Sequence, residues 1–180
     1  MGFSISWVAV KGRSKPAILA ELGLQETGSP ESVSDWPIGG ADLPGGWYLL
    51  FLDDLLHPFT EDAALSSLSK GCYVVACQVE EHVMASAAFA YRDGRKTWDV
   101  THEAELGKRH LAENGELPAE YGQVRDGLLK EQDVGDREEH GVDYVWDIPV
   151  TLAYEVVGFR HDNVYLKTGG EAQFMELVEQ

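Results

Sequence analysis

The stretch from Tyr73 to Tyr91, YVVACQVEEHVMASAAFAY, constrains the fold more than any other part of the chain. Apolar residues occupy nearly every second position, which is the period of a β-strand with one buried face. As one straight strand the stretch would span roughly 60 Å, longer than the diameter of a compact chain of this size. It must therefore bend or reverse direction.

Three polar residues, Glu80, Glu81 and His82, stand at the midpoint of this stretch, and two interpretations of Glu81 remain open. In the first, the chain turns at these residues and Glu81 is solvated, which is the simpler reading. In the second, the strand only bends, and Glu81 is a buried carboxylate on an apolar face, where it would need a partner. The sequence VEEH lacks Gly, Pro, Asn and Asp, and this weak turn chemistry favours the second interpretation.

The chain downstream of this stretch has the pattern of consecutive hairpins. An Asp-Gly pair at 93–94 is the strongest short signal for a two-residue turn, and it predicts that Phe89 lies opposite Trp98. A three-residue turn that ends in glycine follows, and it would place His102 opposite His110. The sequence therefore predicts strands that pair in the order in which they occur.

Further elements are marked by capping residues and by apolar spacing. Strands are predicted at 3–10 and 46–54. The second is apolar almost throughout, which indicates a central strand covered on both faces. The spacing and end residues typical of helices occur in four segments: 14–23, 61–71, 117–132 and 147–159.

Together these elements predict an α+β fold in a single domain, residues 1–180. Its antiparallel sheet would have about five or six strands, with a meander at 71–113 and helices packed on one face. Residues 24–46, rich in Gly, Pro, Ser and acids, are predicted to form a long loop. Residues 131–143 are predicted to form an acidic, mobile loop.

The charge of the chain restricts its partners. A formal net charge of −17 repels a phosphate backbone, so direct nucleic-acid binding is not expected. The same charge favours encounter with a basic protein. Trp36, carried by the predicted 24–46 loop, would be an aromatic anchor for that partner. Glu138 and Glu139 of the acidic loop would supply charge to the same interaction.

Cysteine content and hydropathy suggest a compartment. Cys72 and Cys77 are the only cysteines. On one strand they would lie roughly 16 Å apart, too far for a disulfide, so both are expected to be buried free thiols. No apolar run approaches the roughly 20 residues of a membrane span, and no charged-then-apolar leader opens the chain. We therefore expect a cytoplasmic protein without a membrane segment.

Motifs for catalysis are missing from the sequence. HExxH, CxxC, GxSxG, GxGxxG and GxxxxGK do not occur, which favours a non-enzymatic role without a cofactor. The alternative is a metal-binding or metal-dependent enzyme in which His102 and His110 share a transition metal and a carboxylate completes the ligand set.

Three functions follow from these observations. The first is a non-enzymatic cytoplasmic protein that binds a basic protein, of the toxin-neutralising or assembly-regulating type. The second is the metal-binding protein or enzyme built on the histidine pair. The third is a structural domain that self-associates through open sheet edges.

Overall fold

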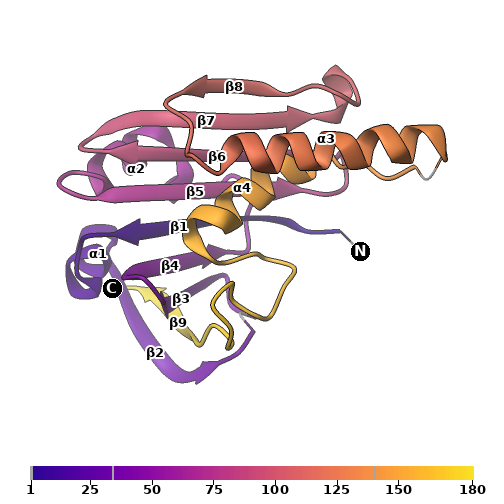
Figure 1. The fold of residues 1–180 in the computed structure, drawn as a ribbon. Helices are drawn as coiled ribbons and strands as arrows, with labels where there is room; N and C mark the ends of the chain where they lie inside the picture. The colour runs from indigo at the N-terminus through magenta and orange to yellow at the C-terminus, as the bar shows by residue number, and fades with distance from the viewer. Residues whose placement is uncertain (1, 34, 140) are drawn as a thin grey trace.

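A single antiparallel sheet of nine strands organises the part of the chain described by this computed structural model, residues 2–33, 35–139 and 141–180 (Figure 1). From one edge to the other the strands are β2 (Leu24–Glu31), β9 (Phe174–Glu179), β3 (Ile38–Leu43), β4 (Trp47–Leu52), β1 (Ser4–Lys11), β5 (Tyr73–Glu80), β6 (Ala85–Arg92), β7 (Arg95–Glu103) and β8 (Ala112–Gly115). The α+β class is confirmed. The expected five or six strands were too few, because β2, β3 and β9 lack a local strand pattern.

Helices cover both faces of the sheet, so the prediction that they pack on one face was wrong. On one face, α4 (Asp147–Val157) packs on β5, β6 and β7, and α3 (Tyr121–Arg137) packs on α4 (Figure 1). On the other face, α1 (Lys15–Leu22) lies against β2 and α2 (Asp62–Leu68) against β6. Across the described ranges, no helix is both long and apolar enough to cross a membrane.

The central strands explain why both faces need cover. In β1, Trp7 and Ala9 belong to the core under α4, whereas Val8 and Val10 belong to the core on the side of α1 and α2. All four residues are at most 1% exposed. A strand that is apolar on both sides must bury both sides to gain the hydrophobic free energy.

Two segments expected to be loops contain regular structure. Residues 24–46 hold β2 and β3, because β9 from the C-terminal end pairs with both of them. Residues 131–137 continue α3, where Gln132 and Gly135 are buried. Long-range pairing and tertiary packing therefore outweigh the weak local signals of both segments. Ser34 and His140, which fall within the two predicted loops, lie outside the described residues.

The predicted meander at 71–113 is confirmed, since β5, β6, β7 and β8 pair in sequence order. Its predicted register was wrong by one residue. Arg92 pairs with Arg95 across the Asp-Gly turn, but Ala90 pairs with Trp98, which leaves Thr97 as an extra residue. This bulge places Asp99, rather than Trp98, opposite Phe89.

Gly40 offers a test of how tightly the sheet is packed. It lies in β3 between β4 and β9, where an added Cβ would overlap the Tyr48 hydroxyl and approach Leu177 Cδ1 to 2.9 Å. We expect Gly40→Ala to lower the free energy of unfolding by about 1–3 kcal/mol in urea denaturation. Gly127→Ala on α3, where a Cβ meets nothing within 4 Å, should raise it by about 1 kcal/mol. Equal changes in the two variants would contradict this account.

Candidate functional site

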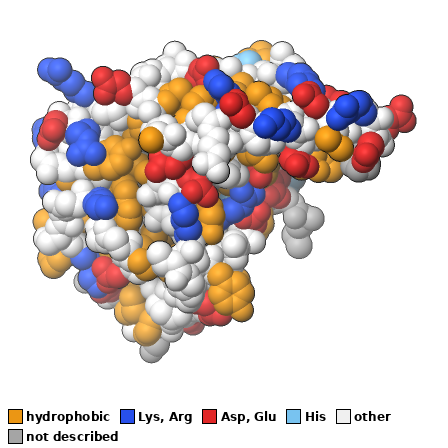
Figure 2. Space-filling view, viewed as in Figure 1, with side chains coloured by type: hydrophobic (Ala, Val, Ile, Leu, Met, Phe, Trp, Pro, Cys, Tyr) orange, Lys and Arg blue, Asp and Glu red, His pale blue; other side chains and the backbone are white. Residues whose placement is uncertain are grey.

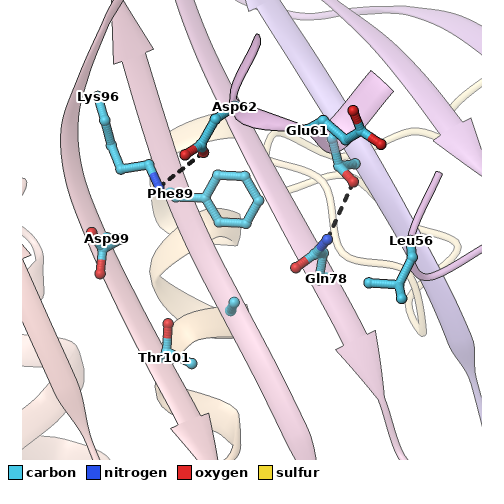
Figure 3. A pocket seen from close by; sticks show the side chains of 10 residues that line it. Leu56, Glu61, Asp62, Gln78, Phe89, Lys96, Asp99 and Thr101 are labelled. Atoms are coloured by element: carbon cyan, nitrogen blue, oxygen red, sulfur yellow. Dashed lines mark hydrogen bonds and ion pairs between the residues drawn. The ribbon is translucent and has the colours of Figure 1, made fainter. Parts of the chain in front are cut away.

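A hollow of about 560 Å³ lies on the α2 side of the sheet, over β5, β6 and β7 (Figure 3). We call it the sheet hollow. Its lining includes Glu61, Asp62, Ala87, Phe89, Lys96 and Asp99. The hollow exists because α2 packs on β6 near Phe89 and Tyr91. The residues on the same face toward the start of β6 are alanines, which are too small to fill the space beside α2.

The hollow continues toward the β5–β6 turn. A smaller pocket of about 130 Å³ shares Leu56, Gln78 and Ala87 with it and extends to Glu80. Gln78 Nε2 donates hydrogen bonds to Thr60 Oγ1 and to the Leu55 carbonyl, both at 3.2 Å, which fixes one wall. Leu56, 72% exposed, stands at the rim. The two pockets form an elongated depression with small side chains on its floor.

Carboxylates outnumber cations in the sheet hollow. Glu61, Asp62 and Asp99 line it, with Lys96 as the one cation among the described lining residues. Asp62 Oδ1 lies 3.1 Å from Lys96 Nζ and also accepts a hydrogen bond from the Tyr91 hydroxyl. The hydrogen bond from Tyr91 and the neighbouring Lys96 hold the pKa of Asp62 below its usual value. Burial raises the pKa of Tyr91 in turn, so its hydroxyl stays a donor.

The arrangement suits the binding of positive charge. Lys96 Nζ lies 5.6 Å from the ring centre of Phe89 and 5.5 Å from that of Tyr91, within cation–π range. Among the described residues that line the hollow of about 560 Å³ itself, none is a histidine or a cysteine. Ser86 and His102 line the smaller pocket, where Ser86 Oγ donates to the Trp146 carbonyl and both ring nitrogens of His102 have protein partners.

The residues predicted to bind a partner lie elsewhere and on separate elements. Trp36 follows β2 and is half-buried, packed against the core under α4 rather than presented to solvent. Glu138 and Glu139 are exposed and follow α3, whose end lies well away from the β2–β3 connection (Figure 1). Sequence spacing could not show this separation. Their role in partner binding stays a prediction.

His102 and His110 do approach each other, with ring centres 6.2 Å apart. They are not a ladder pair, because β8 begins only at Ala112. His102 is fully buried, and its Nδ1 donates to the His110 carbonyl at 2.7 Å. Its Nε2 lies 3.1 Å from Asp143 Oδ2. Both ring nitrogens thus have protein partners, and neither is turned toward a site that the two rings could share.

A metal role for this pair has little geometric support. The Nδ1 atom of His110 accepts a hydrogen bond from the Glu103 amide at 3.0 Å. In the described part of the chain, no group of three or more His, Cys, Asp or Glu side chains is arranged to hold a metal ion. A transition-metal site needs about four ligands, usually with three or more from the protein.

The position of His102 points instead to an anchor for the start of α4. Asp143 bonds His102 through one oxygen and accepts the Trp146 amide through the other, at 2.9 Å. Trp146 Nε1 donates to the Ala85 carbonyl at 3.0 Å, and Ser86 Oγ donates to the Trp146 carbonyl at 2.6 Å. These bonds attach the segment before α4 to β6 and β7.

Glu81 lies in the turn between β5 and β6, as the simpler interpretation predicted. It is nevertheless not fully solvated, since Oε2 accepts the Phe3 amide at 3.0 Å. Its Oε1 lies 3.5 Å from Nε2 of His161, too poorly placed for a hydrogen bond. His161 was not predicted from the sequence. Its side chain is fully buried between Phe3 and Trp146, with ring centres 4.9 and 6.5 Å away.

Comparison with known proteins does not add a family. No family model matches the chain, and no curated protein or solved structure matches it. The site must therefore be interpreted from its own geometry.

The anchoring role of His102 predicts a large loss of stability on truncation. His102→Ala would leave Asp143 and the His110 carbonyl without their buried partner, and we expect a loss of about 3–5 kcal/mol in the free energy of unfolding. His110→Ala should cost about 1 kcal/mol because it loses one hydrogen bond. Urea denaturation with and without EDTA measures both. A zinc-induced stabilisation of the wild type that His110→Ala abolishes would instead support the metal interpretation.

Buried His161 predicts a pH dependence of stability. Burial lowers the pKa of His161, and the positive charge of Arg160 acts in the same direction. The negative charges of Asp162 and Glu81 oppose this shift. The unfolded chain binds a proton at this histidine near pH 6.5, whereas the folded chain binds it only at lower pH. The free energy of unfolding is therefore at its full value above about pH 6.5 and decreases as the pH falls below that value. His161→Phe should reduce the slope of unfolding free energy between pH 5 and 7. An unchanged slope in His161→Phe would refute this assignment.

Proposed function

We propose that this protein is a cytoplasmic, non-enzymatic binding protein whose partner is a basic protein, of the toxin-neutralising or assembly-regulating type. We further propose that the partner contacts the sheet hollow. The observation that carries this proposal is the lining of the hollow, where three carboxylates and the Phe89 ring border a depression over β5, β6 and β7. Such a surface complements extended, positively charged chain.

The overall charge supports the same class of partner. A net charge of −17 creates a field that accelerates encounter with a cationic protein, and the effect weakens as salt screens it. Long-range attraction alone does not define a contact surface. The hollow adds shape and aromatic surface to the general attraction, and these are the features that separate specific from non-specific binding.

The end of α3 is a weaker candidate for this contact. Acidic and basic side chains alternate along the face that carries α3 (Figure 2). Lys108 and Arg109 pair with Asp136 there, and Arg109 also pairs with Asp133. Because these cations compensate the neighbouring acids, a basic partner gains less at Glu138 and Glu139 than the sequence alone suggests.

The cysteines support the proposed compartment. Cys72 and Cys77 are buried as free thiols, one in each core. Burial raises the pKa of Cys77 to about 12, so its thiol is unreactive. Free thiols of this kind suit a reducing environment such as the cytoplasm.

Two charge-matched double variants test the contact surface. Glu61→Gln with Asp99→Asn removes two carboxylates from the hollow, and Glu138→Gln with Glu139→Gln removes two beyond α3. The probe is a fluorescent peptide of alternating arginine and glycine, followed by fluorescence anisotropy at low and physiological salt. We expect the first pair to raise the Kd about 5- to 30-fold, equivalent to about 1–2 kcal/mol. The second pair should raise it less than about twofold.

Two results would count against the proposal. Equal weakening by both double variants would mean that the peptide responds only to net charge. Absence of binding by the wild type at either salt concentration would remove the basic partner altogether.

A further inference from the structure

We propose that the sheet hollow recognises an arginine side chain of the partner, and that Lys96 occupies the position of that arginine until the partner displaces it. This inference rests on the proposed function and specifies the chemistry of the contact. It depends on the surroundings of Lys96, on how weakly Lys96 is held, and on what arginine can gain that lysine cannot.

The surroundings of Lys96 already form a cation subsite. Its Nζ lies 3.1 Å from Asp62 Oδ1 and over the rings of Phe89 and Tyr91, at 5.6 and 5.5 Å from their centres. A carboxylate beside two aromatic faces is the environment in which proteins bind ammonium and guanidinium groups. Tyr91 also donates a hydrogen bond to Asp62, which orients the carboxylate. The subsite is therefore assembled and contains the protein's own cation.

The bulge at Thr97 creates this arrangement. In a regular strand, Lys96 and Trp98 would share one face. The extra residue instead turns Lys96 and Asp99 toward the same side, with Lys96 paired to Tyr91 and Asp99 paired to Phe89. One irregularity thus places the occupying cation and a second carboxylate in the same depression.

Lys96 is held weakly enough to be replaced. Its side chain is 40% exposed and that of its partner Asp62 is 78% exposed. An ion pair between exposed groups contributes little, because water solvates both ions well when they separate. The long lysine chain can therefore move into solvent while β7 and its pairing stay in place.

Arginine gains contacts that a second lysine would not. An incoming lysine would only exchange one ammonium group for another. The guanidinium group is planar, stacks on an aromatic ring and donates to two acceptors at once. Asp62 and Asp99 both belong to the lining of the hollow near Phe89 (Figure 3). A guanidinium over this ring would take the place of Lys96 beside Asp62, with Asp99 as a further carboxylate of the same lining.

The test compares two lysine variants of equal charge. Lys96→Ala empties the subsite, whereas Lys130→Ala removes an exposed lysine on α3, which packs on the opposite face of the sheet. With the arginine–glycine peptide, we expect Lys96→Ala to lower the Kd about 5- to 10-fold and Lys130→Ala to lower it less than about twofold. Lys96→Gln, which keeps most of the chain length without the charge, should also tighten binding, and thermal unfolding checks that each variant is folded.

A second comparison tests the choice of arginine. The wild type should bind the arginine–glycine peptide at least about fivefold more tightly than a lysine–glycine peptide of equal length. Equal affinities for these peptides, or equal effects of Lys96→Ala and Lys130→Ala, would overturn the inference while leaving the proposed function intact. Failure of the wild type to bind either peptide would overturn the proposed function itself.

Discussion

The pairing of β1 with β4 on one side and β5 on the other is the constraint on which the rest of the structure depends. These strands are apolar on both faces, so the sheet needs cover on both sides. Among the described residues, the helical segments on one side are α1, which lies against β2, the short 3-10 helix at Pro58–Thr60, which lies against β1, and α2, which lies against β6 near Phe89 and Tyr91. The rest of β6 on that face and the neighbouring part of β7 stay open and form the sheet hollow.

An open sheet face normally carries polar side chains, and this one does so with an unusual combination. Lys96, Asp99 and Thr101 point into the hollow beside Phe89, whereas Trp98 and Val100 of the same strand enter the core under α4. The bulge at Thr97 is what separates these two sets. Without it, the alternation of β7 would remain in phase with the hairpin turn, and Phe89 would face Trp98. The local irregularity of one strand therefore determines the chemistry of the whole depression.

Local chemistry in the sequence was enough to predict part of this structure. Helix ends such as Gly23 and Gly158, both in the left-handed conformation, are marked by residues within one turn, and the four helices follow from such marks. Strands β2, β3 and β9 depend on partners far away in the chain, and nothing in their own composition identifies them. The bulge at Thr97 was equally invisible, because an Asp-Gly turn predicts only an unbroken register.

The same division holds for the candidate sites. His102 and His110 are close in sequence, and their approach could be predicted from hairpin geometry. The residue that explains His102 is Asp143, which lies 41 positions away. The sheet hollow draws on the segment before α2 and on three strands, so no sequence motif could identify it. Sequence reasoning therefore found the neighbours along a strand and missed what long-range packing brings to them.

The occupied cation subsite also bears on how an acidic protein keeps such a surface folded. Carboxylates gathered around a depression repel one another, and the rings beside them would lose hydrophobic free energy if they were left uncovered. Lys96 reduces both costs, because its ammonium group offsets Asp62 and lies over Phe89 and Tyr91. A partner that replaces Lys96 gains only the difference between its own contacts and those of lysine. Such an exchange favours discrimination between cations over high affinity, since every competing cation must also displace Lys96.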